Sequence, residues 1–155
     1  MIVVASLLTM GLCACGGDPE QPPIEQIIIR APGEPAATMT QVANQAEAGA
    51  SKANLIAAGQ AAFATCSGCH VAEPGAASMA GPNLHGVVGR KAASLDDFAY
   101  SDALSGSGIT WDIASLDRFL ANPAVYVEGT SMAAGAVSDG EQRAAIVAYL
   151  GSLSE

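Results

Sequence analysis

The stretch CSGCH, residues 66–70, holds the side chains with the most evident chemistry in the chain. Two thiols three positions apart, with an imidazole directly after the second, suit a redox disulfide, part of a zinc site or the covalent attachment of a haem. A tetrahedral zinc site needs a fourth ligand, and the only other histidine, His85, has no His or Cys after it. A redox dithiol of this spacing belongs in a βαβ context, which the sequence lacks. Both interpretations are therefore weaker than haem attachment.

Covalent haem attachment explains all three side chains of the motif. Cys-x-x-Cys-His is the known signature of c-type haem proteins. Positions i and i+3 of a helix share a face, so Cys66 and Cys69 can both reach the vinyl groups at one edge of a porphyrin and form thioethers. His70 then falls under the iron. Five residues recur by chance, however, so the rest of the chain must decide.

The motif is preceded by a segment with helical periodicity. From Ser51 onward, Leu55, Gly59, Phe63 and Cys66 recur at the spacing of one helix face, which predicts a helix that leads into the motif. A glycine inside a helix costs about 1 kcal/mol relative to alanine. Gly59 therefore predicts the close approach of another helix.

Two further helices are predicted, and no long strand pattern or internal repeat is present. Residues 71–100 have no consistent period and are expected to form loops. A second helix begins after Asp112 and ends at Asn122, because the residue before a proline leaves helical geometry. The last helix follows Ser138, which forms a capping-box pattern with Glu141. The expected fold class is all-α.

Length and charge restrict the function classes. A chain of 155 residues, half of them apolar, has room for one ordinary domain with a packed core. Fifteen acidic residues against six basic ones give a formal net charge of -9. Nucleic-acid binding requires clustered Lys and Arg, and only Arg90 and Lys91 are adjacent. We therefore expect no nucleic-acid partner and a solvated acidic surface.

The first residues, MIVVASLLTMGLCAC, predict an export signal. The run is too short for a membrane span of about 20 residues. Its end resembles a bacterial lipoprotein signal, with Leu12 and Ala14 before Cys15, so residues 1–14 would be removed and Cys15 lipidated. Cys13 and the absence of a basic residue before the run depart from that pattern. A soluble secreted form and an uncleaved short anchor are the alternatives.

Residues 15–50 are expected to form a flexible tether, because they are rich in Pro, Gly, Ala, Gln and Glu. As a coil this segment would span about 30–35 Å, enough for an anchored domain to reach nearby membrane partners. Its apolar island, Ile27 to Ile29, is either a short strand or a docking contact. The folded domain is expected to cover residues 51–155.

From Ser51 to Glu155 the sequence resembles the class I cytochromes c of mitochondria and proteobacteria. The resemblance runs, in the family's order, through GQAAFATCSGCH, GPNLHGVVGR, FAYSDAL, GITW, FLANP, GTSMAAG and IVAYL. It implies a class I cytochrome c fold, in which short helices wrap around one haem c. The haem would be bound through Cys66 and Cys69, with His70 as one iron ligand.

The resemblance also assigns the other contacts of the haem. Met132 would be the sixth iron ligand, and a thioether ligand favours ferrous iron and raises the reduction potential. The Pro82 carbonyl would bind the second imidazole nitrogen of His70 and fix its orientation. His85 would brace its loop. The positions that hydrogen-bond or neutralise the haem propionates are matched by Arg90, Tyr100, Trp111 and Thr130.

Several residues depart from the family pattern. Phe119 replaces a tyrosine that often bonds the methionine sulfur, and Leu104 replaces an asparagine of a buried water network. Both make the Met132 side less polar. Glu128 replaces a proline, which could loosen the ligand loop. The lysine ring of mitochondrial members is missing, because Ser131, Ala134, Ala136 and their neighbours are uncharged.

The expected function is electron transfer without any substrate transformation. A monomeric, lipid-anchored domain on the periplasmic side of a bacterial membrane would carry single electrons between complexes such as a quinol–cytochrome c reductase and a terminal oxidase. Tethering would replace electrostatic steering by raising the effective concentration. The alternatives are a soluble periplasmic carrier, a haem subunit of a larger redox complex, and a peroxidase or gas sensor if Met132 is labile.

Overall fold

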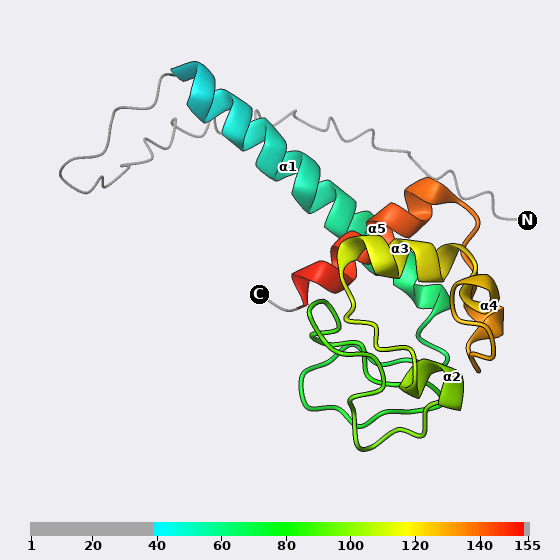
Figure 1. Ribbon diagram of the computed structural model, residues 1–155. Helices are drawn as coiled ribbons and strands as arrows, with labels where there is room; N and C mark the ends of the chain where they lie inside the picture. Colours follow the sequence, from blue (N-terminus) through cyan, green and yellow to red (C-terminus); the bar gives the residue numbers. More distant parts are fainter. Residues whose placement is uncertain (1–38, 154–155) are drawn as a thin grey trace, which may run out of the picture. The chain divides into compact units, whose positions relative to one another are not determined.

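The structure is a computed structural model that describes residues 39–153. The predicted signal, Cys15 and the Ile27 to Ile29 island lie outside the described residues. The elements are α1 (Met39–Ala62), η1 (Phe63–Thr65), α2 (Asp102–Ser105), α3 (Ile113–Ala121), α4 (Pro123–Tyr126), η2 (Ala133–Gly135) and α5 (Gly140–Ser152) (Figure 1). The described part contains no strand, only an isolated bridge between Lys91 and Thr110. The all-α prediction is therefore confirmed.

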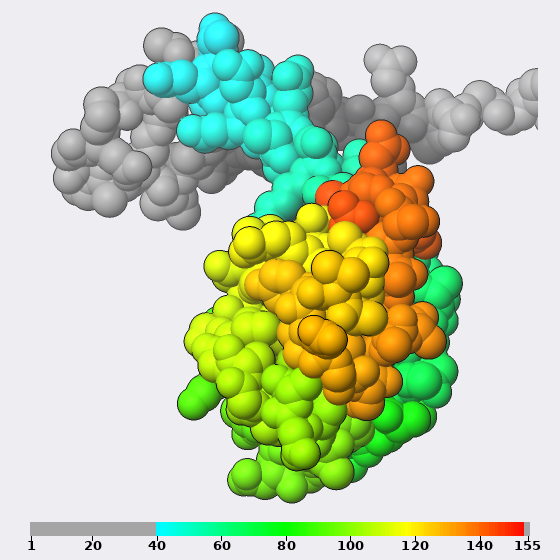
Figure 2. Space-filling model, turned by 45° about the vertical axis from the view of Figure 1, so that its right-hand side comes forward, coloured from blue at the N-terminus to red at the C-terminus, as the bar shows by residue number. Residues whose placement is uncertain are grey.

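The first helix is longer than the sequence predicted. α1 begins at Met39 and not at Ser51, so the prediction of a flexible coil is wrong for residues 39–50. This segment has no proline and contains four Ala and two Gln, which favour a helix without any apolar period. Residues 40–55 are exposed. In Figure 1 this half of α1 extends beyond the other helices, and Figure 2 shows it emerging from the rounded body of the domain.

The other half of α1 crosses α5, and Gly59 lies at the crossing. A Cβ at Gly59 would overlap the Ala145 carbonyl and lie 2.8 Å from the Tyr149 Cβ. The Phe63 and Tyr149 rings pack beside it, with centroids 5.5 Å apart. The close approach predicted from Gly59 is therefore confirmed, and only a residue without a side chain permits it.

Local signals fix the ends of α3. The Asp112 side chain accepts a hydrogen bond from the Ser115 N–H, and the Ser115 Oγ accepts one from the Asp112 N–H. The helix ends at Ala121, and Asn122 then caps α4, which Pro123 opens. Both predicted boundaries of this helix are confirmed.

The cap of α5 lies one residue later than predicted. Asp139, and not Ser138, is the N-cap, and its carboxylate accepts a hydrogen bond of 2.8 Å from the Gln142 N–H. The backbone carbonyl of Ser138 instead accepts a bond from Arg143. The predicted capping box of Ser138 and Glu141 is therefore wrong, because the adjacent carboxylate reaches the third helical N–H.

The core lies between these helices and the loops that follow η1. Its buried members are Phe63, Val87, Ala92, Trp111, Leu116, Phe119, Leu120, Val127, Ile146, Val147 and Leu150. As predicted, residues 71–100 contain no helix. No helix among residues 39–153 has the length and apolar character needed to cross a membrane.

Candidate functional site

A cavity of about 430 Å³ opens between the CSGCH turn, the loops of residues 80–104, α3 and the loop that carries Met132. All residues that the sequence assigned to a haem site line it, namely Cys66, Cys69, His70, Pro82, Arg90, Tyr100, Trp111, Thr130 and Met132. Most of the remaining wall is apolar and includes Leu84, Val87, Leu104, Leu116, Phe119 and Leu150. The fold therefore gathers the candidate side chains, which are far apart in the sequence, around one space.

The CSGCH motif continues η1 as a turn at one edge of the cavity. The N–H groups of Cys69 and His70 both donate to the Cys66 carbonyl, at 3.1 and 3.0 Å. Cys66 is half-buried and Cys69 exposed, and both are free thiols. The two sulfurs are therefore available for covalent bonds to a ligand in the cavity.

His70 is buried, and its ring orientation is fixed. Its Nδ1 donates a hydrogen bond of 2.8 Å to the Pro82 carbonyl, as the resemblance implied. A carbonyl can only accept, so Nδ1 carries a proton, and in the neutral ring Nε2 then keeps a free lone pair. A Cβ at Gly81 would overlap the imidazole, so this glycine is needed for the ring to sit where it does.

Asn83 holds the loop of Pro82, and the sequence reasoning missed it. It is 7% exposed. Its Nδ2 donates to the Glu73 and Ala76 carbonyls at 2.8 and 2.7 Å, and its Oδ1 accepts from the His85 N–H at 2.9 Å. The available signal was its place in GPNLHG, because an asparagine there can both donate and accept. His85 was expected to brace this loop, and it takes part through its backbone N–H and carbonyl.

Arg90 and Trp111 lie side by side because two extended segments pair. The Gly89 N–H donates to the Trp111 carbonyl, and the Trp111 N–H donates to the Arg90 carbonyl. The Arg90 guanidinium donates to the carbonyls of Asn83 and His85 at 2.7 and 3.0 Å. Burial lowers the pKa of Arg90, and the nearby Tyr100 and Asp97 oppose this shift. A half-buried cation thus faces the cavity.

The charges of the cavity wall favour an anionic group. Arg90 and Lys91 line it, and no Asp or Glu does. Burial also raises the pKa of Tyr100, so its hydroxyl remains a hydrogen-bond donor at neutral pH. The carboxylates of a bound molecule would therefore be stabilised on this side.

Met132 lies in the same cavity, next to an apolar wall. Its N–H donates to the Thr130 Oγ1 at 3.3 Å, and its carbonyl accepts from the Gly135 N–H at 3.2 Å. Phe119 is buried, with its ring 5.1 Å from that of Trp111. Met79, in contrast, is 52% exposed and does not line the cavity.

Comparison with known proteins identifies the family. The cytochrome c family model matches residues 56–154 of the chain. The chain belongs to the cytochrome c family. A cytochrome c homolog of Bradyrhizobium diazoefficiens is 41% identical to it over 63% of this chain and 53% of its own length. Cytochrome c2 of Rhodoblastus acidophilus is 43% identical over 60% of this chain and 87% of its own.

A solved structure agrees with this assignment. Cytochrome cH from Methylobacterium extorquens is 46% identical, with a TM-score of 0.58, and the match covers 62% of this chain and 96% of that one. The chain spans about half the length of the Bradyrhizobium relative. The protein is a haem-based electron carrier of class I, and its cofactor is a covalent c-type haem.

The described residues of this cytochrome fit that cofactor. Two free thiols lie at one edge of an apolar cavity, a buried imidazole presents an unprotonated nitrogen, and two cations without competing carboxylates suit the propionates. No group of three or more His, Cys, Asp or Glu side chains within residues 39–153 could hold a metal ion by itself. The donor set therefore suits an iron porphyrin better than a bare metal ion.

Proposed function

We propose that this cytochrome carries single electrons between membrane respiratory complexes, with His70 and Met132 as the two axial ligands of one haem c. When bound, the haem supplies the Fe(III)/Fe(II) couple. The observation that carries the proposal is that the fixed His70 imidazole and the Met132 thioether line one apolar cavity. With both axial positions filled, no open site remains for a substrate, so no catalysis is proposed.

The two thiols would attach the cofactor. Cys66 and Cys69 would each add their S–H across one vinyl group, so each thioether forms without a by-product. The exposed position of Cys69 lets this bond form at the mouth of the cavity. Covalent attachment would prevent loss of the cofactor outside the cytoplasm.

The surroundings of Met132 favour the reduced state. A thioether is a weak donor that stabilises ferrous iron. Phe119 and Leu104 line the same cavity, and their hydrocarbon side chains can offer the sulfur no hydrogen bond. Arg90, Tyr100, Trp111 and Thr130 would bind or neutralise the propionates.

We further propose that residues 1–14 are removed and that a lipid on Cys15 anchors the protein on the periplasmic side of the membrane. The folded cytochrome domain would cover residues 51–155. The donor and acceptor would be complexes such as a quinol–cytochrome c reductase and a terminal oxidase.

The exposed Ser131, Ala134 and Ala136 at the cavity mouth are uncharged, so steering by charge is weak. Confinement to one membrane would supply the encounter rate instead, and the cytochrome would act as a monomer.

Mass and spectra of the protein test this function. Protein made in cells competent for haem attachment should show a pyridine haemochrome spectrum of a doubly thioether-linked haem, and its intact mass should include one haem. The ferric form should be low-spin with a methionine-to-iron charge-transfer band. A mass without haem would refute the cofactor assignment. A high-spin ferric spectrum would refute Met132 ligation and favour a peroxidase or a gas sensor.

A further inference from the structure

The loop that carries Met132, residues 128–137, is called the methionine loop here. Most of its hydrogen bonds join neighbouring residues of the chain. The Thr130 N–H donates to the carbonyl of Val127, which directly precedes the loop. The Met132 N–H donates to the Thr130 Oγ1, and the Gly135 N–H donates to the Met132 carbonyl. Ser131, Ala133, Ala134 and Ala136 are exposed. These bonds shape the loop but do not attach it to the helices.

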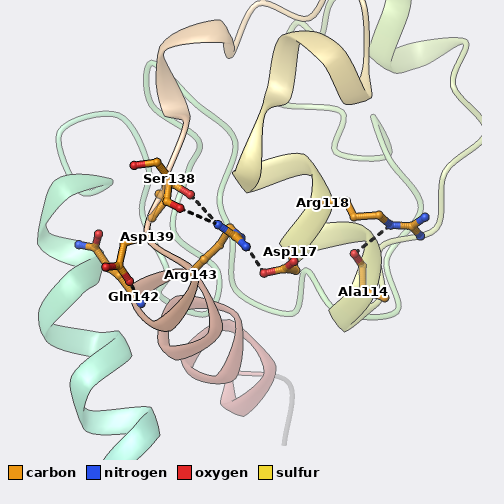
Figure 3. A network of polar contacts seen from close by, with 8 residues as sticks. Ala114, Asp117, Arg118, Ser138, Asp139, Gln142 and Arg143 are labelled. Carbon is orange, nitrogen blue, oxygen red and sulfur yellow. Dashed lines mark hydrogen bonds and ion pairs between the residues drawn. The ribbon is translucent and has the colours of Figure 1, made fainter.

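The attachment lies at the end of the loop and centres on Arg143 of α5. The Arg143 Nη1 donates to the carbonyls of Val137 and Ser138, at 3.0 and 3.3 Å, and its Nε forms an ion pair of 2.7 Å with the Asp117 Oδ1 of α3 (Figure 3). We call this set of contacts the Arg143 clamp. The Val137 N–H also donates to the Leu120 carbonyl at 2.8 Å.

Arg143 is largely buried at a position where a cation is unfavourable, so its contacts with Asp117 and the loop carbonyls must stabilise it there. It lies in the first turns of α5, where the helix dipole disfavours a cation. Its side chain is only 16% exposed, while that of Asp117 is 40% exposed. A planar guanidinium can hold a carboxylate and backbone carbonyls at the same time, and hydrogen bonds to a charged group are stronger than neutral ones.

The clamp joins the methionine loop to the rigid part of the domain. Asp117 follows the buried Leu116 of α3, and α5 buries Ile146 and Val147 in the core. The chain between Met132 and Val137 is short, so movement of Val137 away from α3 would carry Met132 with it. The equilibrium between a closed and an open loop therefore depends on this contact.

We propose that Arg143 is a positioning residue for Met132, because its clamp holds the methionine loop closed and thereby sets how readily Met132 leaves the iron. The proposal rests on the proposed His70 and Met132 ligation. An external ligand can bind the iron only while Met132 is displaced, so its apparent dissociation constant is the intrinsic one divided by the open fraction. Weakening the clamp raises the open fraction and tightens external binding by the same factor.

Imidazole titration of the ferric holoprotein measures this fraction. For Arg143→Gln we expect the apparent Kd of imidazole to fall about tenfold, because charge-assisted bonds to the loop are lost. The apparent Kd of imidazole for Arg143→Lys should lie between those of Arg143→Gln and the wild type. An ammonium can pair with Asp117 but lacks the planar, several-donor geometry of a guanidinium. Asp117→Asn should have the smallest effect, since the bonds to the two carbonyls remain.

Arg118→Gln is the matched control. It makes the same charge change next to Asp117, but the Arg118 Nε donates to the Ala114 carbonyl of its own helix, and its guanidinium lies over the Tyr126 ring. Neither contact involves the methionine loop, so the imidazole Kd should stay within about twofold of wild type. Amide exchange adds a readout independent of iron, because the Val137 N–H should exchange faster in Arg143→Gln than in Arg118→Gln.

The outcomes separate the inference from the function on which it rests. Suppose the wild type shows the methionine-to-iron band, but Arg143→Gln has the wild-type imidazole Kd and the wild-type exchange rate of the Val137 N–H. This result would overturn the role of Arg143 and leave the ligation intact, even if the variant melts at a lower temperature. A wild-type spectrum without the band would overturn the ligation and this inference with it. If Arg143→Gln does not fold, Arg143→Lys and Asp117→Asn decide, and wild-type values in both would overturn the proposal.

Discussion

Two glycines lie against the proposed iron ligands, and they differ in what a side chain would displace. At Gly81 a Cβ would overlap the His70 ring, which the Pro82 carbonyl holds in place. At Gly135 it would overlap the methyl end of Met132 and lie 3.5 Å from the sulfur. The imidazole cannot move without losing its hydrogen bond, whereas the thioether can rotate away.

Gly135→Ala should therefore displace the ligand without unfolding the protein. We expect the methionine-to-iron band of the ferric holoprotein to weaken strongly, while the melting temperature changes by only a few degrees, as for a cost of roughly 1 kcal/mol. Absorption spectra and thermal unfolding measure the two effects. Gly49→Ala is the control, because a Cβ there meets nothing within 4 Å and should leave the band intact. A full band in Gly135→Ala would contradict the expectation.

The residues of the site were predictable to different degrees. Cys66, Cys69 and His70 follow from spacing, because one turn places them together whatever the rest of the chain does. Asn83 and Arg143 could not be found in this way. Their partners, such as the Glu73 carbonyl and Asp117, become neighbours only through the course of the loops and the packing of α5 on α3.

The helices show the same division between local and long-range causes. The ends of α3 were predicted because Asp112, Asn122 and Pro123 act within one turn of the chain. The start of α1 was not, because helix propensity without an apolar face gives no periodic signal. At α5 two adjacent capping residues competed, and Asp139 is the N-cap because its carboxylate accepts a hydrogen bond from the Gln142 N–H.

Two carboxylates connect these elements to the stability of the protein at low pH. Hydrogen bonds from the Ser78 N–H and Oγ lower the pKa of Asp97, and those from Ser115 lower the pKa of Asp112. For a group with a lowered folded pKa, the stabilisation is present above the unfolded value and is lost as the pH falls through the folded value. Acid should therefore loosen the contact between the Ser78 and Asp97 loops and weaken the cap of α3.

Asp97→Asn tests this effect. The free energy of unfolding of the wild type should fall as the pH drops below about 4, and the fall should be smaller in the variant, which has no titrating group at this position. Denaturant unfolding at several pH values measures both. Asp96→Asn makes the same charge change at the preceding residue and controls for the loss of one negative charge. Identical profiles for Asp97→Asn and the wild type would show that the Ser78 contact carries no pH dependence.

At the scale of the whole molecule, the packing depends on the cofactor. Protein interiors are close-packed and leave few voids larger than a water molecule, so side chains that surround about 430 Å³ do not form a complete core by themselves. The sparse aromatics and abundant alanine of the sequence agree with helices that pack around a bulky group. Composition indicates that such a group is needed, while its identity came from the motif and the family.

The methionine loop contributes only uncharged exposed residues to the cavity mouth, namely Ser131, Ala134 and Ala136, so the proposed anchor is decisive for the encounter rate. Cys15→Ser should move the protein from the membrane to the soluble fraction. It should also lower quinol-driven oxygen uptake by membranes at least tenfold at equal amounts of cytochrome, because the gain in effective concentration is lost. Cys13→Ser is the matched control, since this thiol lies in the segment proposed to be removed and its loss should change neither result. The rate of the anchored protein should vary little between low and high salt, because the methionine loop presents no charge at the mouth that salt could screen. Membrane fractionation and an oxygen electrode measure these effects, and a Cys15→Ser protein that stays on the membrane with full activity would refute lipidation at this residue.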